Sequence, residues 1–527
     1  MHCNFQKADR PIYNLTSSKL SFQRSSFSLV CFLSRVNAIL RNLLQSLHRS
    51  SLSRPMLVVL SFGLSLMMTS YSSQALTAET VNVIQGNAPY FTIDGGRTRL
   101  TNLEDLLEIT LSNGKKFNAS NSLDYDEFNP ILVPGGDSFA DIAMTMPIDA
   151  EQLEPEEYGE YQIDMNTLIG PPYNYWGDDD GDGDPTADGY LYLYISDWYG
   201  NGVPRNEVLN ICKAPYNIDL TISDVTLETR YGVPKSDSFK DYLHVIYTVS
   251  PDVPPSVCYA KPILKPGDSD RWEAEYAGPP SIWSRDYGFL TQSYNPSSYG
   301  LNFPTTGSNN LYFDLIISGS KEALSWDPVA HGGITATMTN STKESVRVTL
   351  TGPVATPSQR VSDNPGYLPK PVLPQTFELV GKDSKGNAVV KYGFQLKKWF
   401  ITKGDEYDTK GDCFTIKSWC NSIGYRMVLV NDVTNAYYEE NGINLGALPS
   451  SQNYSLQRNI GAGLFSEWGF MYHYPNAHYG SDENDEVHYF MDRYTPGSRS
   501  ECYLVYTWGT IDTQQDNYPG YGLCVYP

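Results

Sequence analysis

Basic residues are scarce in this chain, which has 38 Lys and Arg against 60 Asp and Glu in 527 residues. The formal net charge of −22 disfavours nucleic acid and anionic membranes as partners, and it favours cations or a basic protein surface. The sequence also lacks a CxxC pair, so a zinc ribbon or a thioredoxin-like redox site has no support. It has no P-loop and no dinucleotide-binding motif either.

Long hydrophobic runs are equally scarce. The apolar stretch over residues 56–68 is 13 residues long, shorter than the roughly 20 residues that a membrane-spanning helix needs. Arg54 precedes it and the small residues Ser73-Gln74-Ala75 follow, a pattern typical of a secretory signal peptide over residues 56–75. An uncleaved anchor is the alternative. No cysteine stands at the expected cleavage point, so we expect no lipid anchor.

The segment upstream of this signal is basic, with eight Lys and Arg residues and one acid in residues 1–55. Such an extension is unusual before a signal peptide. We expect it to be unstructured and the true start to be Met56 or a nearby codon. The mature protein is then exported, to be secreted or held at the cell surface, in the periplasm or on the outer face.

The exported part has the composition of a mainly β protein, with 42 Gly, 34 Pro and 39 Tyr in the whole chain. Residues 190–196 and 345–351 have the residue types and alternation of strands. Six prolines make residues 353–374 a long loop or stiff linker. We expect a β-rich domain over 79–205, an Ig-like β-sandwich region over 206–398, and an α+β domain over 399–527.

One acidic loop predicts a metal site. Asp178, Asp180, Asp182 and Asp184 alternate with other residues, and Gly183 occupies the sixth place, as at the start of a calcium loop. The twelfth place is Gly189 rather than glutamate, so this is not an EF-hand. We expect a structural Ca²⁺ in a β-loop; a solvated acidic turn is the alternative, and no other cofactor is expected.

Six cysteines remain after export, an even number suited to disulfides in an oxidising compartment. Six cysteines allow 15 pairings. Proximity in sequence favours Cys212–Cys258, and it leaves two bridges for the C-terminal domain.

The C-terminal domain contains a distinctive set of residues in a fixed order: Cys420, Gly424-Tyr425-Arg426, Thr434-Asn435, Gly461-Ala462-Gly463, Glu467-Trp468-Gly469 and Cys524. With these residues it resembles the C-type-lectin-like domain that ends intimin- and invasin-type bacterial adhesins. The resemblance covers about residues 399–527, with one departure: Val428 stands where proline is usual. It implies that the two ends of the domain meet through a Cys420–Cys524 bridge, with Cys413–Cys502 as an additional bridge. A local Cys413–Cys420 bridge competes with these, but two helical turns would separate those Cα atoms by about 10 Å.

The same resemblance implies adhesion to a protein receptor on a host or neighbouring cell. The Ca²⁺-dependent sugar-binding motifs of vertebrate C-type lectins are absent from residues 399–527, although a carbohydrate-binding surface protein remains the alternative. No segment resembles the β-barrel that displays such adhesins, so we expect a soluble exported protein or one held by a partner. We place the receptor surface on Tyr472, Tyr474, Tyr479, Asp482 and Glu483, with Trp468 in the core.

A catalytic alternative is a GDSL-type esterase. Ser138 within Gly136-Asp-Ser-Phe139 and His488 within Asp485-Glu-Val-His488 match short motifs of that family. The alternating strands and helices of its α/β fold are missing around Ser138, so we expect no enzyme.

These assignments predict a mature chain that begins near Leu76 and has no free cysteine. Intact-mass spectrometry of the secreted protein is expected to show the loss of residues 1–75 and no alkylation before reduction. Retention of residues 1–55, or a thiol that alkylates without reduction, would contradict the export assignment.

Overall fold

The computed structural model describes residues 86–152, 159–181, 183–239, 242–269, 274–480, 488–492, 502–513 and 519–527. The proposed signal peptide and the basic extension lie outside these ranges. We call residues 86–252 the N-terminal unit, 256–396 the middle unit and 398–527 the C-terminal unit. None of the helices in the described ranges is long and apolar enough to span a membrane.

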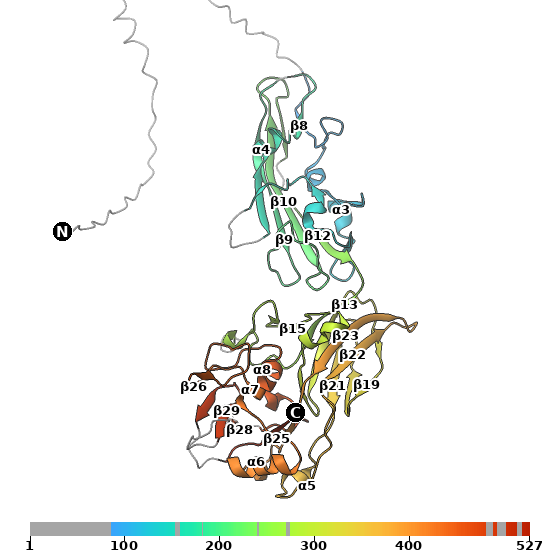
Figure 1. Ribbon diagram of the computed structural model, residues 1–527. Helices are drawn as coiled ribbons and strands as arrows, with labels where there is room; N and C mark the ends of the chain where they lie inside the picture. The colour runs from blue at the N-terminus through green and yellow to red at the C-terminus, as the bar shows by residue number, and fades with distance from the viewer. Residues whose placement is uncertain are drawn as a thin grey trace, which may run out of the picture. The chain divides into compact units, whose positions relative to one another are not determined.

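The N-terminal unit is built on a seven-stranded sheet whose long strands β9, β10 and β12 lie side by side (Figure 1). Their inward residues form one hydrophobic cluster with the short elements that cover the inner face. The strand order is β4 (Ile131–Pro134), β12 (Leu243–Asp252), β10 (Tyr216–Glu228), β9 (Thr186–Ser196), β7 (Glu160–Asp164) and β6 (Glu151–Gln152), with β11 (Ser236–Phe239) paired to β10. The short elements are β1 (Tyr90–Phe91), η1 (Leu103–Leu107), β2 (Ile109–Thr110), β3 (Lys116–Phe117), α3 (Ala119–Ser122), η2 (Phe139–Asp141), β5 (Ala143–Met144), α4 (Met165–Ile169) and β8 (Trp176–Gly177).

This sheet corrects one domain boundary. The sequence places a boundary between residues 205 and 206, but β10 and β12 pair with β9 in the same sheet. The N-terminal unit therefore continues to Asp252. The antiparallel pairing of β9 with β10 is a contact that only the folded chain shows.

The middle unit is a β-sandwich. A seven-stranded antiparallel sheet and a three-stranded sheet bury a shared core, in which the ring of Phe313 meets that of Phe394 edge to face at 6.0 Å. The larger sheet has the order β14 (Trp283–Ser284), β15 (Gly288–Leu290), β13 (Ser256–Lys261), β17 (Tyr312–Ser318), β21 (Ser345–Thr351), β20 (Ile334–Thr339) and β19 (Val329–His331). The smaller has β18 (Ser325–Trp326), β22 (Gln375–Lys382) and β23 (Ala388–Leu396); the helices are η3 (Ala274–Tyr276), η4 (Pro296–Leu301) and α5 (Pro357–Arg360).

The C-terminal unit is α+β, and its two ends pair. Strand β24 (Lys398–Thr402) at its start runs antiparallel to β31 (Leu523–Tyr526) at its end, so that Ile401 faces Cys524. The other elements are η5 (Tyr407–Thr409), α6 (Cys413–Ser422), β25 (Arg426–Met427), α7 (Val430–Val433), β26 (Glu439–Glu440), β27 (Ile443–Asn444), α8 (Leu464–Trp468), η6 (Met471–His473), β28 (His488–Asp492), β29 (Cys502–Tyr506) and β30 (Ile511–Thr513). Strand β16 (Thr306–Ser308) joins this sheet parallel to β24. The predicted mainly β class, with sandwiches ahead of an α+β unit, is confirmed.

Helix α6 is attached to two strands by disulfides. Asp412 caps its N-terminus by accepting from the backbone N–H of Thr415 at 2.8 Å, and this hydrogen bond lowers the pKa of Asp412. Cys413 and Cys420 are both buried. The bridges Cys413–Cys502 and Cys420–Cys524 join α6 to β29 and β31, and Cys212–Cys258 joins the N-terminal unit to the middle unit. These are the three pairings expected from the sequence.

One buried carboxylate ties the middle and C-terminal units together. Glu467 on α8 is fully buried, and it accepts from the backbone N–H groups of Thr305, Thr306 and Gly461 at 2.8–3.1 Å. The hydroxyls of the two threonines also donate to it. Five donors therefore replace its hydration, which makes burial of the charge tolerable. The neighbouring Trp468 indole donates to the Thr306 carbonyl at 3.1 Å, and both units share one hydrophobic core.

We expect Glu467→Gln to destabilise the protein by about 3 kcal/mol, because the new amide NH₂ would face backbone N–H donors and leave them unsatisfied. Urea unfolding of the mature chain measures the change. The matched control is Glu344→Gln in the same body, where the side chain is 70% exposed; its effect is expected within about 0.5 kcal/mol. Equal stability of the two variants would remove the structural role assigned to Glu467.

Candidate recognition surface

Two of the three tyrosines assigned to the receptor surface are core residues. Tyr474 is 1% exposed and Tyr479 is 3% exposed. The Tyr474 hydroxyl donates to the Trp468 carbonyl at 3.0 Å and accepts from the backbone N–H of Ile263 at 3.0 Å. This corrects the sequence assignment: the middle unit covers these rings. Trp468 is fully buried, as expected.

Of the other three residues assigned to the receptor surface, the structure describes only Tyr472. Tyr472 is half-buried, and its ring stacks on Phe470 with centroids 5.5 Å apart. Asp482 and Glu483 lie outside the described residues. The proposed surface therefore does not exist as an aromatic patch.

A different segment exposes large apolar side chains. Leu448 is 77% exposed, Tyr454 76% and Ile443 62%, and Tyr437 is also exposed. All four belong to residues 437–454, which we call the apolar loop. Strands β26 and β27 form a short hairpin within it, visible at the edge of the C-terminal unit in Figure 1. Because large exposed apolar side chains are concentrated in this one segment, we take it as the candidate interaction surface.

The apolar loop is held by a buried asparagine. Asn435 is fully buried, and its side-chain NH₂ donates to the Pro449 carbonyl at 3.0 Å. Its side-chain oxygen accepts from the backbone N–H of Gln457 and the hydroxyl of Ser466, both at 2.9 Å. One side chain thus fixes points before, within and after the loop, so the exposed anchors sit on an ordered base. The Thr434-Asn435 motif in the sequence was the available signal for this segment.

Asp432 on α7 orients the chain just before the loop. Its carboxylate, which is 2% exposed, pairs with Arg426 at 2.5 Å and with Lys398 at 2.6 Å. Burial alone would raise the pKa of Asp432, but the hydrogen bond from Arg426 and the charge of Lys398 outweigh burial and lower it.

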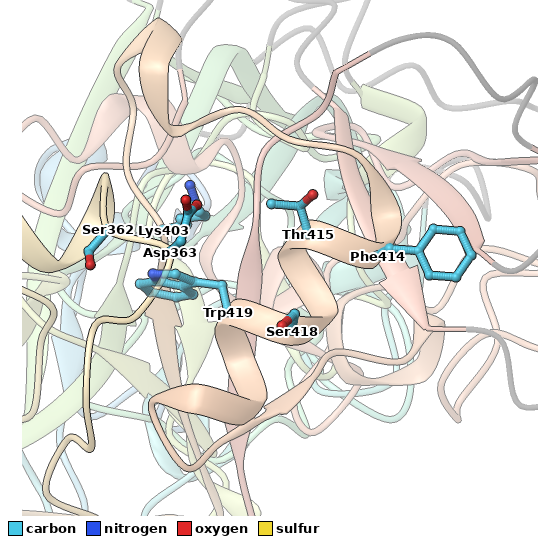
Figure 2. A pocket seen from close by; sticks show the side chains of 7 residues that line it. All are labelled: Ser362, Asp363, Lys403, Phe414, Thr415, Ser418 and Trp419. Carbon is cyan, nitrogen blue, oxygen red and sulfur yellow. The ribbon is translucent and has the colours of Figure 1, made fainter.

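A cavity of about 320 Å³ lies beside α6. Ser362, Asp363, Lys403 and Trp419 gather on one side of the helix, whereas the ring of Phe414 points away from them (Figure 2). Lys403 is buried, which lowers its pKa, and its Nζ donates to the Thr409 carbonyl at 3.0 Å. The Trp419 indole donates to the Gln359 carbonyl at 3.0 Å. These contacts give both side chains structural roles in holding neighbouring loops.

The described carboxylates of the acidic loop pair with cations or backbone. Asp179 pairs with Arg99, Asp184 with Arg230 at 3.1 Å, and Asp180 accepts from the backbone N–H of Asn87 at 2.8 Å. Within the described ranges, no three His, Cys, Asp or Glu side chains are grouped to hold a metal ion. Asp182 lies outside those ranges, and calcium binding through Asp178, Asp180, Asp182 and Asp184 stays a prediction from the sequence.

Ser138 has a structural partner. Its hydroxyl donates to Asp141 at 2.7 Å and its backbone N–H donates to the same carboxylate at 2.8 Å, at the start of η2. These bonds lower the pKa of Asp141. His488 begins β28 in the C-terminal unit, and its side chain lies outside the described part. Ser138 is thus engaged as a helix cap.

No family model matches the sequence, and no curated protein does. Among solved structures, it is similar to invasin, described as a bacterial integrin-binding protein, at 13% identity and a TM-score of 0.30, over 65% of this chain and 50% of that chain. The chain thus spans half the length of that protein.

Two further solved structures are similar with lower TM-scores. One is a C-terminal 282-residue fragment of intimin in complex with the intimin-binding domain of the translocated intimin receptor, at 10% identity and a TM-score of 0.25, over 65% of this chain and 94% of that chain. The other is the Bacteroides ovatus protein SGBP-B from a mixed-linkage glucan utilization locus, bound to a heptasaccharide. It is 12% identical with a TM-score of 0.12, over 51% of this chain and 65% of that chain.

The ion pairs of Asp432 predict that the stability of the folded chain falls at acid pH. Because the pKa of Asp432 in the folded chain lies below its ordinary value of 3.8, its contribution is complete above that pH and is lost as the pH falls further. We expect Asp432→Asn to cost about 3 kcal/mol at pH 7 and to flatten the decline below pH 4. Unfolding measured from pH 7 to 2.5 tests this. In the control Asp327→Asn, the exposed pair with Lys382 is lost and the decline is expected to be unchanged.

Proposed function

We propose that this chain is an exported, adhesin-like recognition protein that binds a protein receptor on another cell through its apolar loop. The observation that carries the proposal is the exposure of Ile443, Leu448 and Tyr454 on a segment held by the buried Asn435. Apolar and aromatic anchors supply most of the energy of protein interfaces. An ordered base reduces the entropy lost on binding.

The sequence resemblance to intimin- and invasin-type adhesins supports the same proposal. It rests on Cys420, Cys524 and Glu467-Trp468-Gly469, to which the structure gives framework roles. Gly469 has a φ of 79°, and a Cβ there would lie 2.3 Å from the Lys265 carbonyl oxygen, so glycine is required. A framework of this kind that carries an exposed apolar loop is consistent with receptor binding. Export through residues 56–75 and release or display outside the cell are part of the proposal.

Charge selects among protein partners. Glu439 and Glu440 lie on the hairpin of the apolar loop, and the whole chain carries a net charge of −22. A basic rim on the receptor would therefore speed association and fix its orientation. Aliphatic anchors such as Leu448 and Ile443 fit apolar pockets of a protein better than the hydroxyl-rich surface of a sugar.

The test uses the fluorescently labelled mature chain on a panel of cultured cells. We expect saturable binding that is lost when surface proteins are removed with trypsin. The double variant Leu448→Ser/Tyr454→Ser is expected to weaken it by tenfold or more, because truncation of an anchor typically costs about 1–4 kcal/mol.

The matched control is Leu123→Ser/Tyr231→Ser in the N-terminal unit, whose side chains are 87% and 56% exposed. This variant is expected to bind like the parent. Equal loss in both double variants, or binding that survives trypsin, would count against the proposal.

A further inference from the structure

The outward face of the N-terminal sheet carries a row of tyrosines. Tyr190, Tyr192 and Tyr194 alternate along β9 with Leu191, Leu193 and Ile195, which are fully buried. The three tyrosines therefore point to solvent, on the face opposite the core. Tyr192 and Tyr194 are half-buried, and Tyr190 is 43% exposed. β9 lies between β7 and β10, so the row runs along the middle of the sheet.

The three rings follow one another along the strand, and the first two are in contact. Residues two apart in a strand are separated by about 6.6–6.8 Å. The ring centroids of Tyr190 and Tyr192 are 6.2 Å apart with planes inclined by 38°. Two hydrogen bonds hold the phenol groups: Gln162 Nε2 donates to the Tyr192 hydroxyl at 3.3 Å, and the Tyr194 hydroxyl donates to the Gly200 carbonyl at 3.2 Å. The row is an ordered platform.

Hydrogen-bonding side chains flank the row on both sides. The antiparallel register sets one flanking residue beside each tyrosine from each neighbouring strand, on the same face. The exposed side of the sheet thus combines aromatic faces in the centre with acceptor groups along both edges. From β7 these residues are Asp164, Gln162 and Glu160, and from β10 they are Ser223, Thr221 and Asp219.

We propose that this face binds an extended, uncharged polysaccharide. Sugar rings present apolar C–H faces that stack on aromatic rings, and equatorial hydroxyls that point sideways toward carboxylate, amide and hydroxyl groups. A row of aromatic rings between two rows of acceptors has the matching pattern. The platform is preformed, so little ordering entropy is lost when a chain of sugars binds.

Charge disfavours acidic occupants and a second copy of the chain. Glu160, Asp164 and Asp219 repel nucleic acid and acidic polysaccharides. A second copy of the chain would bring the same carboxylates against each other across a two-fold axis. Asp219 also pairs with His244 on β12 at 2.7 Å, which fixes one carboxylate at the edge of the row. A neutral polymer rich in hydroxyl groups avoids each of these penalties.

The experiment measures binding of the mature chain to a glycan array of neutral oligosaccharides, with affinities from calorimetry on the strongest hexasaccharide. We expect saturable binding to at least one neutral β-linked series, with a Kd below about 1 mM. Hexagalacturonate, which is anionic, is expected not to bind. The double variant Tyr190→Ala/Tyr192→Ala is expected to lose tenfold or more in affinity, since two stacked rings are removed.

Two further variants keep the result interpretable. Tyr192→Phe retains the ring and is expected to bind within about threefold of the parent. Tyr231→Ala removes an exposed ring outside the row and is expected to leave affinity unchanged. Thermal unfolding must give the same midpoint for each variant. Absence of binding across the neutral array, stronger binding of hexagalacturonate, or full affinity in the double variant would each overturn the proposal.

Discussion

The fully buried carboxylate of Glu467 is the constraint on which the rest of the C-terminal half depends. Removing an ionised carboxylate from water costs several kcal/mol unless hydrogen bonds replace its hydration. The replacing donors belong to Thr305 and Thr306 in the middle unit and to Gly461 in the C-terminal unit. Because neither unit alone supplies all of them, the two fold around a single core. This shared core explains why rings that look like surface residues in the sequence are covered.

A buried arginine and two disulfides complete this framework. Arg458 is fully buried, with its guanidinium carbon 4.4 Å from the centroid of the Trp283 ring and Nη2 donating to the Ile263 carbonyl at 2.8 Å. Burial lowers its pKa. Across the unit, the disulfides from α6 reach β29 and β31. With its frame fixed at these points, the C-terminal unit can carry long irregular segments, and the apolar loop is one of them.

The two exposed surfaces differ in chemistry and lie on different units. The apolar loop offers aliphatic and aromatic anchors from one short segment, whereas the tyrosine row offers flat rings between acceptor groups on a rigid sheet. The Cys212–Cys258 bridge joins the units that carry them, and Tyr199 donates to Tyr259 beside it at 3.3 Å. Under the two proposals, the chain would contact a protein through one unit and a polysaccharide through the other.

The sequence alone predicted those elements that are defined by residues close together in the chain. The long β-prone run over residues 190–196 predicted β9, and cysteines seven residues apart marked one face of α6. The resemblance to the adhesin family supplied the pairing of Cys420 with Cys524. The burial of Tyr474 and the extension of the first sheet past residue 205 were decided only by tertiary structure. Both depend on contacts between segments distant in the chain, and a sequence period shows which residues share a face but not which other segment covers that face.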